Sequence, residues 1–201
     1  MEKTIIYIHG KGGNAREAEY YKPLFQGYNV IGYDYKAQTP WEAKEEFPIF
    51  FDLVSKNQKS IMLIANSIGA YFAMQALTDK KIDRAFFISP IVNMEKVILN
   101  MMTWEGITEN DLQEKKEIRT AFGETLSYEY LEYVRKHPID WNIFTDVLYG
   151  EKDNITSRET MLDFVNRHNA RLTEMKNGEH WFHTEEQMKF LAFWISHNTK
   201  S

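Results

Sequence analysis

The sequence contains no cysteine, so its fold cannot depend on disulfide bonds. It also lacks an apolar run that approaches the length of a membrane span, and residue 4 already opens a predicted strand, which leaves no room for an export signal. The lysines occur in scattered pairs within a net charge of −5, so no basic stripe forms. We therefore expect a cytoplasmic protein with a small-molecule substrate and with neither nucleic acid nor membrane as a partner.

Short β-branched or aromatic runs alternate with longer amphipathic stretches along the chain. The runs predict strands near residues 4–9, 29–34, 60–65, 84–89, 146–149 and 171–175. The amphipathic stretches predict helices near residues 16–25, 41–55, 68–78, 157–168 and 184–197. Near-continuous apolar strands joined by helices predict an α/β fold. In it, a mostly parallel sheet of about six strands forms the middle layer of a three-layer sandwich.

The alternation breaks between residues 91 and 144. Helices near residues 92–102, 109–122 and 127–136 are predicted to fill this segment. At 201 residues and 43% hydrophobic, the chain can bury one substantial core. We therefore expect a single domain over residues 1–201, with residues 91–144 forming a small helical cap insertion within it.

A serine follows the most apolar of the predicted strands. Ser67 stands between the run that ends at Ala65 and the helix that begins near Ile68, with Gly69 two positions later. A turn that leads directly from a strand into a helix strains the residue at its apex and requires small neighbours. The pattern A-x-S-x-G is typical of a nucleophile elbow, whereas a helix N-cap is the ordinary alternative for a serine at this place.

A glycine-rich loop follows the first predicted strand and begins at His9. Its backbone N–H groups can approach a ligand closely and supply half of an oxyanion hole, from Lys11 or alternatively from Gly12. The N–H of Ile68 would supply the other half, at a helix N-terminus that favours negative charge. His9 itself is interpreted as a structural residue beneath the loop.

An acid and a histidine follow the last two predicted strands. Asp153 comes just after Gly150, and His180 lies on the loop before the final helix. The chain order of serine, acid and histidine is typical of one class of triad hydrolases. His183 is an alternative general base, and Asp153 also fits ordinary turn chemistry. A metal pair of His180 and His183 is disfavoured because no third ligand has a useful spacing.

These four motifs together resemble the α/β-hydrolase family over essentially the whole chain outside the insertion. The resemblance implies a Ser67, Asp153 and His180 triad that hydrolyses an ester-type bond of a small, partly apolar substrate through an acyl-enzyme, with no metal or organic cofactor. Ala65 stands where the family has its first elbow glycine. The strand that carries His9 is already the first, which implies a minimal six-stranded member.

Two other functional classes fit parts of the sequence. Residues 10–15 match the fingerprint G-x-G-x-x-G/A after a strand, and Asp34 closes the second strand as a ribose-binding acid would. An NAD(P)-type dinucleotide-binding protein is therefore an alternative, although it leaves the elbow, Asp153 and His180 unexplained. A receptor or lyase that keeps the hydrolase fold without hydrolysis is another, since fold alone does not determine function.

Overall fold

The computed structural model describes residues 3–199, so the first two and last two residues of the predicted 1–201 domain lie outside it. The chain divides into two compact units, one formed by Met1–Val92 with Asp140–Ser201 and the other by Asn93–Ile139. We call these units the body and the insertion. The insertion falls inside the range of residues 91–144 expected from the sequence.

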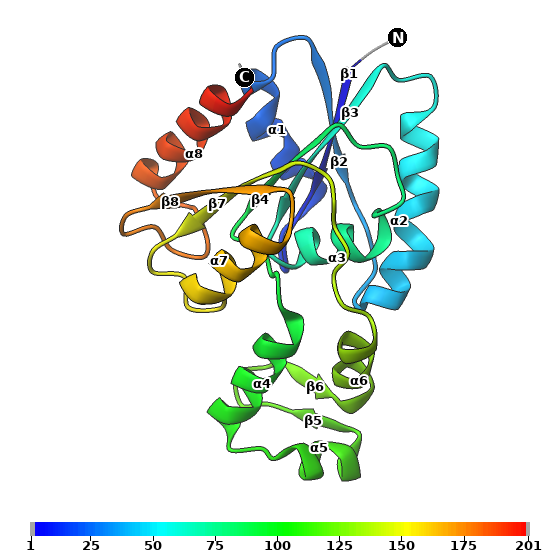
Figure 1. Cartoon of the computed structure of the whole chain (residues 1–201), viewed down its shortest axis with the longest axis vertical. Coiled ribbons are helices and arrows are strands. Elements are labelled where there is room, and N and C mark those ends of the chain that lie inside the picture. Colours follow the sequence, from blue (N-terminus) through cyan, green and yellow to red (C-terminus); the bar gives the residue numbers. More distant parts are fainter. Residues whose placement is uncertain (1–2, 200–201) are drawn as a thin grey trace. The chain divides into compact units, whose positions relative to one another are not determined.

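The body is built on a six-stranded sheet within residues 3–199, in the order β2-β1-β3-β4-β7-β8 (Figure 1). Its strands are β1 (Lys3–Ile8), β2 (Tyr28–Tyr33), β3 (Ser60–Asn66), β4 (Arg84–Ile88), β7 (Thr145–Gly150) and β8 (Ala170–Met175). All neighbouring strands in this sheet run parallel. The predicted parallel sheet is therefore confirmed, and the loops that leave its strands gather at one edge.

Helices cover both faces of the sheet, which confirms the three-layer arrangement (Figure 1). On one face, α1 (Ala18–Tyr21) and α8 (Glu185–Asn198) pack against alternate strand residues such as Ile5, Ile64 and Phe86. On the other face lie α2 (Pro40–Ser55) and α3 (Ile68–Ala76), and Phe47 of α2 contacts the ring of Tyr33. Helix α7 (Arg158–Arg167) packs along β8.

The predicted helix over residues 16–25 is wrong as a continuous element. The structure has a 3₁₀ helix at Ala15–Glu17, the four-residue α1, and a second 3₁₀ helix at Lys22–Leu24. Pro23 lies at the start of the last piece and has no backbone N–H to donate. Ala18 and Tyr21 are buried, as the amphipathic pattern of this segment predicts, but the backbone is α-helical over four residues only.

The insertion contains a β-hairpin that the sequence pattern missed. Its elements are α4 (Met94–Glu105), α5 (Glu109–Lys115), β5 (Glu117–Arg119), β6 (Thr125–Ser127) and α6 (Tyr128–Lys136). The predicted helix over residues 109–122 is therefore wrong in its second half. Lys116 adopts a left-handed φ of 66° that ends α5, and β5 then pairs antiparallel with β6. This strand pairing overrides the helical propensity of the local residues.

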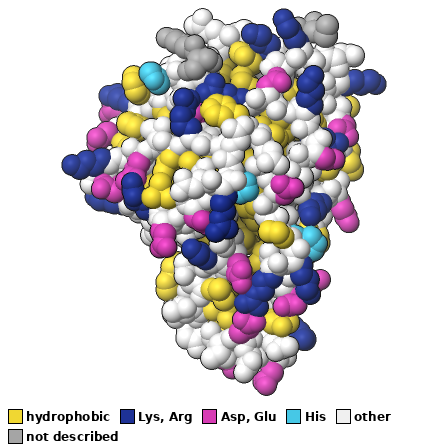
Figure 2. All heavy atoms as spheres, viewed as in Figure 1, with side chains coloured by type: hydrophobic (Ala, Val, Ile, Leu, Met, Phe, Trp, Pro, Cys, Tyr) yellow, Lys and Arg dark blue, Asp and Glu magenta, His cyan; other side chains and the backbone are white. Residues whose placement is uncertain are grey.

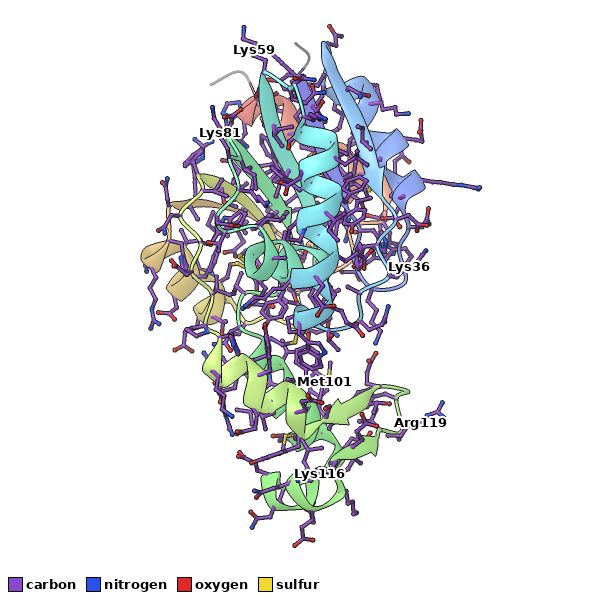
Figure 3. All side chains as sticks on the ribbon, turned by 90° about the vertical axis from the view of Figure 1, so that its right-hand side faces the viewer. Lys36, Lys59, Lys81, Met101, Lys116 and Arg119 are labelled. Carbon is purple, nitrogen blue, oxygen red and sulfur yellow. The ribbon has the colours of Figure 1, made fainter. Side chains whose placement is uncertain are left out.

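Charged side chains of both signs are mixed on the face of the molecule shown in Figure 2. On the face in Figure 2, Lys and Arg interleave with Asp and Glu rather than gathering into one stripe. Figure 3 shows Lys59 and Lys81 near one end of the body and Lys36 near the other. Within residues 3–199, no helix combines the length and the apolar character needed to cross a membrane.

Candidate active site

Ser67 occupies a strained turn between β3 and α3. Its backbone has φ 49° and ψ −119°, in the half of conformational space that a residue other than glycine seldom occupies. The side chain makes no capping hydrogen bond to α3, so the N-cap interpretation is not what the structure shows. Ala65 is fully buried in β3, and the sheet therefore accommodates its methyl group where the elbow pattern has glycine.

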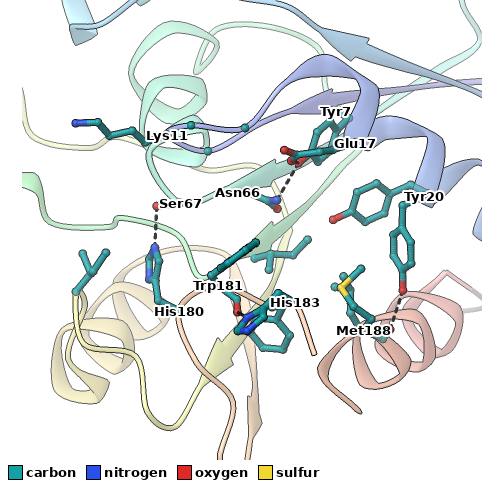
Figure 4. Close-up of a pocket in the computed structure, with 18 residues that line it drawn as sticks. Tyr7, Lys11, Glu17, Tyr20, Asn66, Ser67, His180, Trp181, His183 and Met188 are labelled. Carbon is teal, nitrogen blue, oxygen red and sulfur yellow. Dashed lines mark hydrogen bonds between the residues drawn. The ribbon is translucent and has the colours of Figure 1, made fainter. Parts of the chain in front are cut away.

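His180 links Ser67 to Asp153 through two hydrogen bonds. The Nε2 atom of His180 lies 2.8 Å from Ser67 Oγ (Figure 4). Its Nδ1 atom lies 2.7 Å from Asp153 Oδ2. Residues 113 positions apart thus meet at the carboxyl edge of the sheet. A buried carboxylate on Nδ1 holds that nitrogen as the donor and leaves Nε2 as the acceptor for the serine proton.

The carboxylate of Asp153 is held in place by the loop that follows β7. Its Oδ1 atom accepts hydrogen bonds from the backbone N–H groups of Ile155 at 2.8 Å and Thr156 at 3.0 Å. The Asp153 side chain is fully buried and that of His180 is 14% exposed. One oxygen of Asp153 therefore accepts the backbone hydrogen bonds of the turn, and the other orients the imidazole of His180.

His183, the alternative base, points to other partners. Its Nδ1 atom lies 2.7 Å from the carbonyl oxygen of Trp181, and its ring stacks on the Trp181 ring with centroids 4.4 Å apart. Its backbone N–H donates to Gln187 at the start of α8. In this structure the histidine that is hydrogen-bonded to Ser67 is therefore His180.

The glycine-rich loop turns tightly beside Ser67. The N–H of Gly13 donates to the carbonyl of Gly10 at 3.1 Å, and Gly12 has a left-handed φ of 74°. Beneath it the His9 ring stacks on Tyr35, whose hydroxyl donates to the His9 carbonyl at 2.9 Å. His9 is thus a structural residue, and Lys11 and Gly12 line the same pocket as Ser67.

This pocket encloses about 720 Å³ and is formed by body residues. Its walls combine aromatic, aliphatic and polar side chains, among them Tyr7, Glu17, Tyr20, Tyr21, Asn66, Ile155, Trp181, Phe182, Met188 and Leu191 (Figure 4). Such a mixture suits a small molecule that is partly apolar. Sequence reasoning assigned none of these residues to the pocket wall, because each has the signature of an ordinary core or surface position.

Burial changes the acid–base properties of the tyrosines in this wall. Burial raises the pKa of Tyr7 far above its usual range, and the nearby Tyr21 and Glu17 add to the effect. Burial also raises the pKa of Tyr21, while the Asn66 amide acts in the opposite direction. Burial raises the pKa of Tyr20 as well. The phenols in the pocket therefore stay neutral throughout the physiological pH range.

The residues proposed for dinucleotide binding do not form a common site. The loop of residues 10–15 leads into a three-residue 3₁₀ helix rather than a long helix whose N-terminus would hold a pyrophosphate. Asp34 is exposed and pairs with Lys36 at 2.9 Å, and it does not line the Ser67 pocket. In the part of the chain from residue 3 to residue 199, no three His, Asp or Glu side chains gather as a metal-binding group would.

Comparison with known proteins identifies the fold. No known family profile matches the chain. The mouse alpha/beta hydrolase domain-containing protein 10 superposes with a TM-score of 0.78 at 17% identity, covering 98% of this chain and 89% of that one. Est1E from Butyrivibrio proteoclasticus gives a TM-score of 0.78 at 14% identity and covers 99% and 87%. An esterase from Pyrococcus furiosus gives 0.63 at 20% identity and covers 99% and 81%.

One curated relative is similar in sequence, a Mycoplasma genitalium protein named "Putative esterase/lipase 3". It is 28% identical over an alignment of 103 residues, which covers 45% of this chain and 37% of the length of that relative. The structural neighbours confirm the resemblance stated above at the level of the fold: the chain has the α/β-hydrolase fold, and it is similar to a protein named as an esterase/lipase.

Proposed function

We propose that the chain is a serine hydrolase that cleaves an ester-type bond of a small, partly apolar substrate. The observation that carries this proposal is the chain of hydrogen bonds from Asp153 through His180 to Ser67 at a strained elbow. Such a chain makes a serine hydroxyl nucleophilic, because the imidazole removes its proton as it attacks. The esterase names of the relatives support an ester as the substrate class.

The reaction proceeds in two acyl-transfer steps. Ser67 Oγ attacks the carbonyl carbon while its proton passes to His180 Nε2, and that proton then leaves with the alcohol as the acyl-enzyme forms. Water attacks the acyl-enzyme with His180 again acting as base, which releases the acid and restores Ser67. Asp153 keeps the imidazole in the required tautomer and stabilises its charged form.

The negative charge on the carbonyl oxygen needs donors at the elbow. We assign these to the backbone N–H of Ile68, the first residue of α3, and to that of Lys11, with Gly12 as the alternative on the same loop. Loss of one such donor costs about 3 kcal/mol of transition-state stabilisation in other enzymes. No metal or organic cofactor has a role in this mechanism.

Turnover of short and medium p-nitrophenyl esters tests the proposal. The wild-type protein should hydrolyse them, the Ser67→Ala variant should be inactive, and Ser55→Ala, a change at a partly exposed serine at the end of α2, should behave as wild type. A fluorophosphonate probe should label the wild-type protein and Ser55→Ala but not Ser67→Ala. Full turnover by Ser67→Ala would show that the site is wrongly assigned.

The same measurements separate the alternative functions. A receptor or lyase with this fold would give little ester turnover even where the probe labels Ser67. A dinucleotide-binding protein would enhance NADH fluorescence in a saturable way, which we do not expect given the position of Asp34. A cytoplasmic location remains a prediction that cell fractionation would test.

A further inference from the structure

The pocket contains a carboxylate that the proposed mechanism does not use. Glu17 ends the 3₁₀ helix after the glycine-rich loop and lines the pocket together with Ser67. Its Oε1 atom accepts a hydrogen bond from the Asn14 backbone N–H at 3.1 Å. Its Oε2 atom accepts one from the hydroxyl of Tyr7. The first bond completes a helix cap, but the second directs the other oxygen toward the pocket wall.

The hydrogen bonds around Glu17 place both of its oxygens as acceptors. Tyr7 accepts a hydrogen bond from Asn66 Nδ2 at 2.9 Å, so the single proton of its hydroxyl is available for Glu17 (Figure 4). Burial raises the pKa of Tyr7, which keeps that proton on the phenol. Both oxygens of Glu17 are therefore placed to accept, as carboxylate oxygens do.

The charge of Glu17 is not neutralised by another side chain. Its hydrogen-bond partners are a phenol and a backbone amide, and across residues 3–199 it takes part in no ion pair with Lys, Arg or His. The other permanently charged residue of the pocket is Lys11, on the loop beside Ser67. A partly buried carboxylate without a counter-ion attracts a positive charge strongly, because little water screens it.

Three tyrosines line the pocket together with this carboxylate. The rings of Tyr7 and Tyr21 stack with centroids 5.1 Å apart, and Tyr20 meets Tyr21 edge to face at 5.2 Å. All three line the pocket. The hydroxyl of Tyr20 donates to the Met188 carbonyl at 2.7 Å, which fixes that ring between α1 and α8. Faces of tyrosine rings attract cations, especially alkylated ammonium groups.

From this arrangement we propose that Glu17 and the partly exposed ring of Tyr20 bind a positively charged ammonium group on the substrate, with the buried rings of Tyr7 and Tyr21 packed behind them. That the bound group belongs to a substrate rests on the proposed hydrolase function, since the scissile carbonyl would lie at Ser67 in the same pocket. Asn66 and Tyr7 act as positioning residues that hold the carboxylate in its orientation. The substrate class is thus an ester that carries an ammonium group in its acyl or alcohol part.

Binding of two isosteric alcohols tests the cation site without any reaction. Choline and 3,3-dimethyl-1-butanol differ in charge but hardly in shape, and calorimetry or ligand-detected NMR measures their affinities. The wild-type protein should prefer choline by about tenfold or more, and salt should reduce the preference. Glu17→Gln should remove most of it. An equal affinity of the two alcohols, an absence of choline binding, or a preference that survives in Glu17→Gln would overturn the inference.

Glu46→Gln is the matched control. Like Glu17, Glu46 accepts a tyrosine hydroxyl, that of Tyr33 at 3.1 Å, and backbone N–H groups, here those of Lys36 and Ala37, yet it does not line the pocket. The choline preference should persist in this variant. Its loss in both variants would show a general effect of removing a structural carboxylate and would contradict the assignment to Glu17.

Hydrolysis of a second isosteric pair connects the site to the reaction. The p-nitrophenyl esters of 4-(trimethylammonio)butyric acid and 5,5-dimethylhexanoic acid are compared by kcat/KM. Each value is divided by the rate constant for hydrolysis of the same ester by hydroxide, which corrects for the intrinsic reactivity of the ester. The corrected kcat/KM of the cationic ester should be about tenfold higher than that of the neutral ester, mainly because its KM is lower. Glu17→Gln should abolish this preference for the cationic ester. If neither ester is cleaved, the hydrolase proposal fails, while the choline measurement still decides the cation site. If both are cleaved equally, the ammonium substrate is wrong and the hydrolase proposal stands.

Discussion

Gly69 lies directly against the backbone of His9. A Cβ atom on Gly69 would stand 2.3 Å from the His9 carbonyl oxygen and 3.0 Å from that of Ile8. The helix after the nucleophile is thereby packed on the strand that leads into the glycine-rich loop. Because the obstructing atoms belong to the backbone, a side chain at this position must displace one element from the other.

Gly69→Ala should therefore weaken both stability and activity. We expect a loss of about 1–3 kcal/mol in the free energy of unfolding, measured with urea, and a lower kcat/KM. Gly10→Ala is the comparison, since its Cβ would lie 3.3 Å from Ser67 Cβ and 3.4 Å from the Asn66 carbonyl oxygen, which requires only a small adjustment. Equal losses of stability in the two variants would contradict this account of Gly69.

The two neighbouring histidines should differ sharply in their effect. His180→Gln removes the group that bonds Ser67, so kcat should fall by at least about a thousandfold. His183→Gln removes a ring stacked on Trp181 at the pocket wall and should change kcat less than about tenfold. Steady-state kinetics on one p-nitrophenyl ester compares them. A larger loss in His183→Gln would reassign the base.

Asp153→Asn should reduce kcat by about ten-thousandfold while the fold stays intact. An amide at this position favours the wrong tautomer of His180, as the corresponding change does in other triad enzymes. Glu151→Gln provides the control, because Glu151 is an exposed acid two positions earlier whose contact is the N–H of Asn177. Circular dichroism should be unchanged in both variants. Comparable kinetic losses would mean that the acid has been assigned to the wrong residue.

A buried ion-pair network stabilises the sheet away from the site. Asp146 is 1% exposed and pairs with Arg84 and Arg171, each at 2.6 Å. Asp146→Ala should lower the free energy of unfolding by about 3–5 kcal/mol, because Arg84 would remain largely buried without its partner. Glu174→Ala, which breaks an exposed pair with Arg158, should cost less than about 1 kcal/mol. Chemical denaturation measures both losses. A similar loss of unfolding free energy in Asp146→Ala and Glu174→Ala would contradict the stronger contribution of the buried pair.

Stability should decrease above about pH 10. Burial raises the pKa of Tyr7, Tyr21, Tyr33 and Tyr35 in the folded state, so the unfolded chain releases these phenol protons first. The unfolded state then binds fewer protons, and the free energy of unfolding falls as the pH rises. Urea titrations between pH 8 and about pH 11 should show this decline, and Tyr7→Phe should make it shallower. A stability independent of pH in this range would contradict the burial of these hydroxyls.

Much of the body could be predicted because its signals are local. The apolar runs of β1, β3 and β4 have the length and composition of buried strands, and the amphipathic stretch before Ser55 has the period of a helix. The elbow at Ser67 also leaves a local mark, since only small residues fit around a strained turn. The hairpin at Glu117–Ser127 left no such mark, because its strands are three residues long and gain their stability by pairing with each other.

The sequence by itself determined the parallel sheet, the elbow serine, and the order in which an acid and a histidine follow it. Only the tertiary structure decided that His180 rather than His183 meets Ser67, and that Glu17, Tyr7 and Asn66 form one wall of its pocket. The physical reason is the range of the forces involved. Hydrophobic periodicity and turn chemistry act over a few residues, whereas a hydrogen bond between residues 59 positions apart exists only after the sheet has brought its loops together.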